Sequence, residues 1–78
     1  MSVAYEEIVD FIAAGPSSED VVNFQPSEHV KAHVAGMIHR QKSTGLSAEE
    51  TAELNQYLPL EHLMRLAKAR ARQRLAGE

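Results

Sequence analysis

The C-terminal part of the chain carries five basic side chains at helical spacing. Arg65, Lys68 and Arg72 recur at intervals of three and four residues, so on a helix they form one row. Arg70 and Arg74 form a second row across the same helix. Arginine binds phosphates and carboxylates bidentately, which makes both rows candidates for contact with nucleic acid or with an acidic protein. A third interpretation is a solvated helix end, since cations stabilise helix C-termini by about 0.3–1 kcal/mol.

The distribution of charge favours a protein partner for these cations. Residues 1–61 contain ten acidic and three basic residues, whereas residues 62–77 contain five basic residues and no acidic one. The net charge of −3 and the lack of aromatics in the basic run argue against RNA or single-stranded DNA. Ala67, Ala71 and Leu75 form a small apolar stripe between the rows, which suits an acidic groove on a protein. We expect a protein-interaction module, with a DNA-binding regulator that uses the same arginines as the alternative.

Two histidines have the spacing of a metal site. His29 and His33 are four residues apart, so on a helix they share a face and could hold one ion. The chain has no cysteine, and Glu28 is poorly aligned to act as a third ligand. We therefore expect both histidines to be exposed polar side chains, and we expect no metal or other cofactor.

Catalytic chemistry has little support in this sequence. Glu61 and His62 are adjacent, but a general base needs a pocket and an orienting group. There is no Ser–His–Asp spacing and no glycine-rich phosphate loop. Glu61 is expected to pair with Arg65, four residues later, for about 0.2–0.5 kcal/mol. We expect the chain not to be an enzyme.

Length and composition indicate one small domain. A chain of 78 residues is marginally stable alone, because domains this short bury only about 60 % of their unfolded surface. Without cysteine, disulfides and thiolate metal sites are excluded, which leaves oligomerisation or partner binding as a source of stability. No apolar run approaches the ~20 residues of a membrane span, and no signal peptide pattern opens the sequence. We expect a cytoplasmic protein.

The periodicity of apolar residues predicts an all-α domain of three to four helices. The expected helices cover residues 4–14, 18–24, 28–42 and 48–76. Ser47 and Glu50 have the spacing of a capping box, which is the clearest local signal in the chain. Pro59 falls inside the last segment, so we expect a long, kinked C-terminal helix, with a break into two helices as the rival interpretation.

We assign the apolar residues to three groups: a core, a lid that covers it, and further apolar residues on the last helix that the core does not need. The expected core comprises Tyr5, Ile8, Ile12, Val30, Val34, Met37, Leu54, Leu58 and Leu63. The short segment with Val21, Val22 and Phe24 is expected to cover the longer helices as a lid. The further apolar residues on the last helix predict a homodimer through residues 57–75, with an interface that includes Tyr57, Leu60, Met64 and Leu75.

Three stretches carry a resemblance to a known family. They are the run from Tyr5 to Pro16, the run Val-Asn-Phe-Gln-Pro-Ser at 22–27, and the run Leu-Glu-His-Leu-Met-Arg-Leu-Ala-Lys-Ala-Arg-Ala-Arg at 60–72. Together they make the chain resemble a family of short helical bacterial proteins of cyanobacterial type. The resemblance implies an antitoxin-like or accessory partner of nucleases and other toxins, often dimeric, with no catalytic role. Members often lack a proline at the position of Pro59, which would make a kink there particular to this chain.

Overall fold

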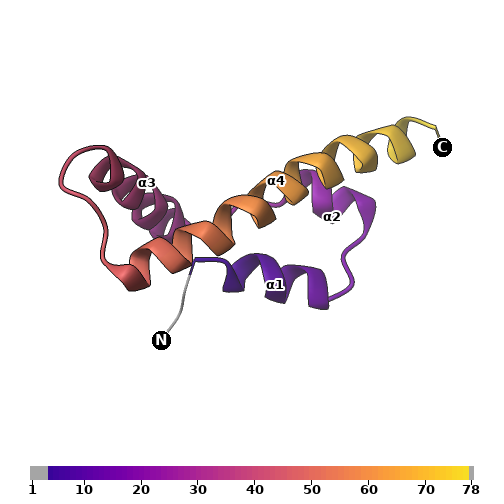
Figure 1. The fold of residues 1–78 in the computed structure, drawn as a ribbon. Helices are drawn as coiled ribbons and strands as arrows, with labels where there is room; N and C mark the ends of the chain where they lie inside the picture. Colours follow the sequence, from indigo (N-terminus) through magenta and orange to yellow (C-terminus); the bar gives the residue numbers. More distant parts are fainter. Residues whose placement is uncertain (1–3, 78) are drawn as a thin grey trace.

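The part of the chain that the structure describes consists of four α-helices and their connections. The computed structural model describes residues 4–77 and contains α1 (Glu6–Ala13), α2 (Ser18–Asn23), α3 (Glu28–Lys42) and α4 (Ala48–Ala76), as Figure 1 shows. No strand occurs within these residues. The prediction of an all-α domain with a long C-terminal helix is confirmed, and each helix lies within two residues of its expected bounds.

Serine residues begin three of the helices. The hydroxyl of Ser47 accepts the amide of Glu50 at 3.1 Å, and the Glu50 carboxylate accepts the amide of Ser47 at 3.2 Å, which confirms the capping box. Ser17 and Asp20 form a second capping box, with both bonds at 3.1 Å. Ser27 caps α3 by accepting the amide three residues later at 3.2 Å. Each cap stabilises its helix by about 1 kcal/mol.

Glycine ends two helices, and proline does not end the last one. Gly15 and Gly45 have φ angles of 70° and 91°, the left-handed conformation in which glycine stops a helix at no steric cost. Helix α4 runs through Pro59 without a break, so the continuous-helix interpretation is the correct one. Pro59 deprives the carbonyl of Asn55 of its amide donor, and because both residues are exposed, water can take the donor's place.

The molecule is elongated because α4 is long. Twenty-nine helical residues span about 43 Å, and the longest dimension of the protein is 49 Å. The radius of gyration is 14.3 Å, against about 11.5 Å for a compact domain of this length. In Figure 1, α3 and the first half of α4 form a V, and the C-terminal end of α4 extends past the other helices. The accessible surface is 5501 Å², whereas a compact monomer of this mass exposes about 4,700 Å².

The core lies where α1, α3 and the first two-thirds of α4 meet. Its buried members are Ala4, Ile8, Val30, Val34, Met37, Leu54, Tyr57 and Met64. Five of these residues were expected in the core from the sequence. Tyr5, also expected there, is half-buried and packs against them. The lid is confirmed for Val21 and Phe24, which pack on the core, and the ring of Phe24 lies 4.4 Å from that of Phe11, centroid to centroid.

Three expected core residues are instead exposed. Ile12, Leu58 and Leu63 have exposed fractions of 47 %, 40 % and 50 %. The α4 face that packs inward is the one with Leu54 and Tyr57, and Leu58 and Leu63 point away from it. The apolar stripe of α4 is wider than the surface that its neighbours cover, which is why periodicity alone chose too many residues.

The predicted dimer interface is also wrong in part, because the face of α4 that was expected to bind a second copy packs inward within the single chain. Tyr57 is 2 % exposed and Met64 is 5 % exposed, so both are buried within the single chain and are not available to a second copy. Leu60 is half-buried against the core. Only Leu75, which is 41 % exposed, remains on the surface.

Candidate partner-binding site

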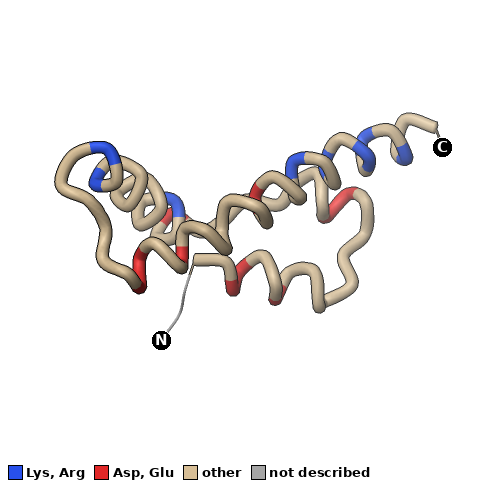
Figure 2. The backbone as a smooth tube through the Cα atoms, in the orientation of Figure 1, with Lys and Arg blue, Asp and Glu red and all other residues tan. Residues whose placement is uncertain are grey.

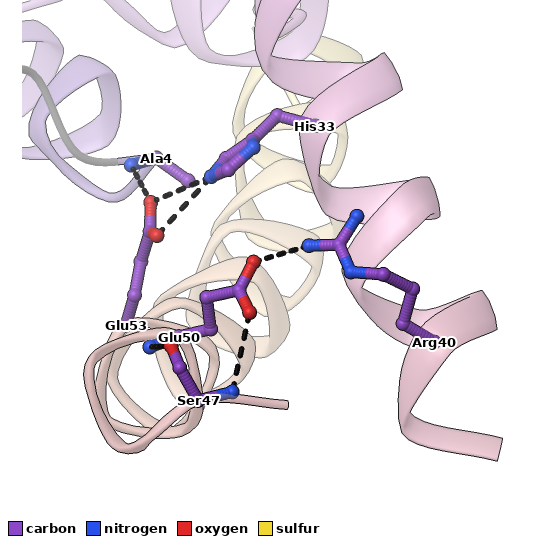
Figure 3. Close-up of polar contacts among 6 residues, drawn as sticks. All are labelled: Ala4, His33, Arg40, Ser47, Glu50 and Glu53. Carbon is purple, nitrogen blue, oxygen red and sulfur yellow. Dashed lines mark hydrogen bonds and ion pairs between the residues drawn. The ribbon is translucent and has the colours of Figure 1, made fainter. Parts of the chain in front are cut away.

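The first half of α4 uses its polar side chains to hold the fold together. The carboxylate of Glu53 accepts the amide of Ala4 at 2.7 Å and lies 3.1 Å from Nε2 of His33, as Figure 3 shows. Partial burial works against the charged form of Glu53. The amide of Ala4 and the imidazole of His33 outweigh it and hold the pKa of Glu53 below its ordinary value. One carboxylate thus joins α4 to α3 and to the start of the described chain.

A second contact joins the same two helices, one turn before Glu53 on α4. Arg40 in the last turns of α3 donates to the carboxylate of Glu50, which also accepts the amide of Ser47 (Figure 3). The bond from the Ser47 amide, followed by the charge of Arg40, lowers the pKa of Glu50. The five residues between α3 and α4 bring these groups together, although no sequence motif predicted the pair.

Helix α1 is attached to α3 by a similar bond. The carboxylate of Glu7 accepts the amide of Ser27 at 2.8 Å, and this bond lowers the pKa of Glu7. The two residues are twenty positions apart in the sequence, so helical spacing could not reveal their interaction. The carboxylates of Glu7, Glu50 and Glu53 therefore serve the structure and are not free for a partner.

The two histidines of α3 have different surroundings. His33 faces Glu53 across the α3–α4 contact, and His29 is exposed at the start of α3. Within residues 4–77, no three His, Asp or Glu side chains gather closely enough to hold a metal ion.

The second half of α4 is covered on one side only. Helix α2 packs along it, and Ala71, at 5 % exposed, is its last buried residue. From Arg72 onward every residue to Gly77 is exposed. Figure 2 shows basic residues along this end of α4 and on α3, and acidic residues on α1, on α2, at the start of α4 and midway along it. The charge asymmetry of the sequence is thus also an asymmetry in space.

The two rows of cations lie on different sides of α4. Lys68 lies within about 60° of the buried Met64 and Ala71 around the helix axis, whereas Arg65 and Arg72 lie about 80–120° from them, at one edge of the inward face. Arg65 donates to the carboxylate of Glu61, the pairing expected from the sequence, and its side chain remains 68 % exposed. Lys68 is half-buried, whereas Arg65 and Arg72 are exposed.

The second row begins on the outer face of the helix at Arg70 and reaches the other edge of the inward face at Arg74, which lies about 60° from Ala71 around the axis. Arg70 and Arg74 are exposed and follow Leu63 and Leu66 at helical spacing. Leu63 and Leu66 are 50 % and 56 % exposed. The outer face therefore combines apolar residues in its first part with an arginine in its last part.

A cavity of about 220 Å³ lies beside the first row. Its apolar walls are Ile8, Phe24, Pro26, Tyr57 and Met64. Its polar rim consists of Glu61, Arg65 and Lys68. Burial raises the pKa of Tyr57, and the nearby Glu61 carboxylate raises it further, so the phenol stays protonated as a donor at neutral pH. The sequence analysis missed this cavity because Phe24 and Pro26 reach it from the α2–α3 connection, and no local pattern indicates that approach.

Comparison with protein-family models, with curated protein sequences and with solved structures finds no match to this chain. The resemblance to short helical bacterial proteins therefore stays a hypothesis. None of the helices in residues 4–77 combines the length and apolar content needed to cross a bilayer.

Proposed function

We propose that the chain is a non-catalytic interaction module that binds an acidic partner protein through the second half of α4. Arg65, Lys68 and Arg72 are the proposed contact residues, with Arg70 and Arg74 of the second row as a weaker contribution. An antitoxin-like or accessory role, as the resemblance implies, is the form of this function that we favour.

The observation that carries the proposal is that basic side chains of α4 line the same cavity as apolar side chains. The cavity has apolar walls, and two of the three cations in the first row, Arg65 and Lys68, form part of its rim. A protein segment supplies both carboxylates and apolar side chains, so it can use the rim and the walls together. Several cations of this kind raise the association rate and orient the partner.

A DNA-binding regulator is the competing function. Duplex DNA would use the arginines for phosphate contacts but would gain nothing from an apolar cavity or from exposed Leu63 and Leu66. These features favour the protein partner.

A pull-down from the native host tests the choice. The tagged full chain is used as bait with and without nuclease, and the retained proteins are identified by mass spectrometry. We expect a protein that survives nuclease treatment and is lost when Arg65, Lys68 and Arg72 are all replaced by glutamate. A bait with Arg70→Glu and Arg74→Glu is the matched control and should retain it. Retention of DNA alone would contradict the proposal.

We also propose that the chain forms a homodimer through the outer face of α4. Leu58, Leu63 and Leu66 are 40–56 % exposed on that face, so they replace the interface expected from the sequence. Burial in a dimer would remove this apolar area from water. Sedimentation equilibrium at tens of micromolar should show a dimer that Leu63→Gln with Leu66→Gln converts to a monomer. A monomeric wild-type chain would contradict self-association.

A further inference from the structure

We infer that the cavity is one end of a longer groove that takes an acidic, amphipathic segment of the partner with two apolar anchors. The inference rests on the proposed function and names the chemistry of the partner. A second depression, of about 360 Å³, is lined in part by the same residues. Pro26, Tyr57 and Glu61 line both, so the two spaces adjoin.

The floor of the groove is apolar along its length. Tyr57 and Met64 form it in the cavity, and Val34, Ala35 and Ile38 on α3 form it in the second depression. Both spaces open to solvent, so an apolar side chain can enter each without separation of the helices. Two anchors on one segment match this shape, as they do when an amphipathic helix docks in a groove.

The charges of the groove select an acidic segment. Arg65 and Lys68 line the cavity, and Lys31 lines the second depression. Lys31 is held in place by Gln25 at 3.0 Å and Glu28 at 3.2 Å. Glu61 is the only carboxylate in the lining of the two spaces, and Arg65 already pairs with it. Carboxylates that flank two apolar anchors would meet a cation in each of the two spaces.

Selection from a displayed library of random 14-residue peptides tests the groove without knowledge of the partner. The bait is the full chain. We expect the selected peptides to be acidic and to carry two large apolar residues at helical spacing. Ala35→Trp fills the second depression, and Ala32→Trp on the same helix is the matched control, since both alanines are exposed and Ala32 does not line the groove. Lys68→Glu reverses one charge on the rim of the cavity, and Arg70→Glu is its control.

The selected peptides should bind Ala35→Trp and Lys68→Glu at least tenfold more weakly than wild type, and both controls within twofold. Loss with Lys68→Glu but not with Ala35→Trp would overturn the groove and leave the proposed function standing. Peptide binding that neither substitution weakens would contradict the inferred groove, and so would the selection of basic peptides. The pull-down tests the proposed function separately. A wild-type dimer that Ala35→Trp dissociates would show that a second copy occupies the groove, which would also overturn the inference.

Discussion

The two halves of α4 differ in what surrounds them. The first half packs on α3 and α1, buries Leu54 and Tyr57, and uses Glu50 and Glu53 in bonds to other elements. The second half has α2 on one side, buries Met64 and Ala71 but no residue after Ala71, and carries cations whose charges few neighbours neutralise. A single helix thus supports the fold with one end, while its other end is largely exposed, and we propose that this end binds the partner. Substitutions in the two halves should therefore have separable effects.

The largest contrast is expected between two leucines of α4. Leu54 is 1 % exposed, and Leu66 is 56 % exposed. Leu54→Ala should lower the free energy of unfolding by about 2–5 kcal/mol, because it removes buried methyl groups and leaves a cavity. Leu66→Ala should change it by no more than about 0.5 kcal/mol. Urea unfolding of dilute protein measures both, and a similar loss for the two variants would contradict the division.

A smaller effect is expected for the carboxylate that joins α4 to α3. Glu53→Ala leaves the Ala4 amide and His33 without their acceptor and should cost about 1–2 kcal/mol, reduced by the partial exposure of the site. Glu49→Ala is the control, since Glu49 is exposed one turn earlier on the same helix. Thermal unfolding should show a midpoint lower by several degrees for Glu53→Ala alone. Equal midpoints would mean that the Glu53 bonds do not stabilise the fold.

The same carboxylates predict how stability depends on pH. The pKa values of Glu7, Glu50 and Glu53 lie below their ordinary value of 4.5 in the folded protein. Their contribution to stability is therefore complete above about pH 4.5 and is lost as the pH falls through the folded pKa values. Thermal midpoints measured from pH 6 to pH 3 should fall mainly below pH 4.5, and less steeply in Glu53→Gln. An unchanged slope in that variant would contradict the role of Glu53.

The smallest effect on stability is expected in the second half of α4. Replacement of Arg65, Lys68 and Arg72 by glutamine should change the free energy of unfolding by about 1 kcal/mol or less, because exposed ion pairs contribute little. Circular dichroism with thermal unfolding checks this. A variant that unfolds would show that Lys68 or its neighbours are part of the core.

Local signals predicted the helices well and the packing only in part. Ser47, Gly15 and Gly45 act through their own backbone neighbourhood, so the sequence around them is sufficient to place helix ends. Which apolar residues are buried depends on the width of the covering helices, and this is why Leu63 was expected inside and Tyr57 at an interface. The contact of Glu53 with His33 spans twenty residues, and helical periodicity carries no information on such pairs.

The charged row of the candidate site could be predicted, and the cavity beside it could not. Arg65, Lys68 and Arg72 follow one another at spacings that any α-helix aligns. The cavity exists because the α2–α3 connection places Phe24 and Pro26 beside Tyr57. That placement is a property of the tertiary structure, so only the structure could reveal it.

The affinity of the purified partner for charge-reversed chains tests the central claim most directly. The chain with glutamate at positions 65, 68 and 72 is compared by isothermal titration with wild type and with the Arg70→Glu, Arg74→Glu double variant. We predict that the triple variant binds at least tenfold more weakly, which corresponds to about 1.4 kcal/mol or more, while the double variant stays close to wild type. Unchanged affinity in a folded triple variant would show that the basic end of α4 is only a solvated helix terminus. A greater loss in the double variant would assign binding to the second row instead.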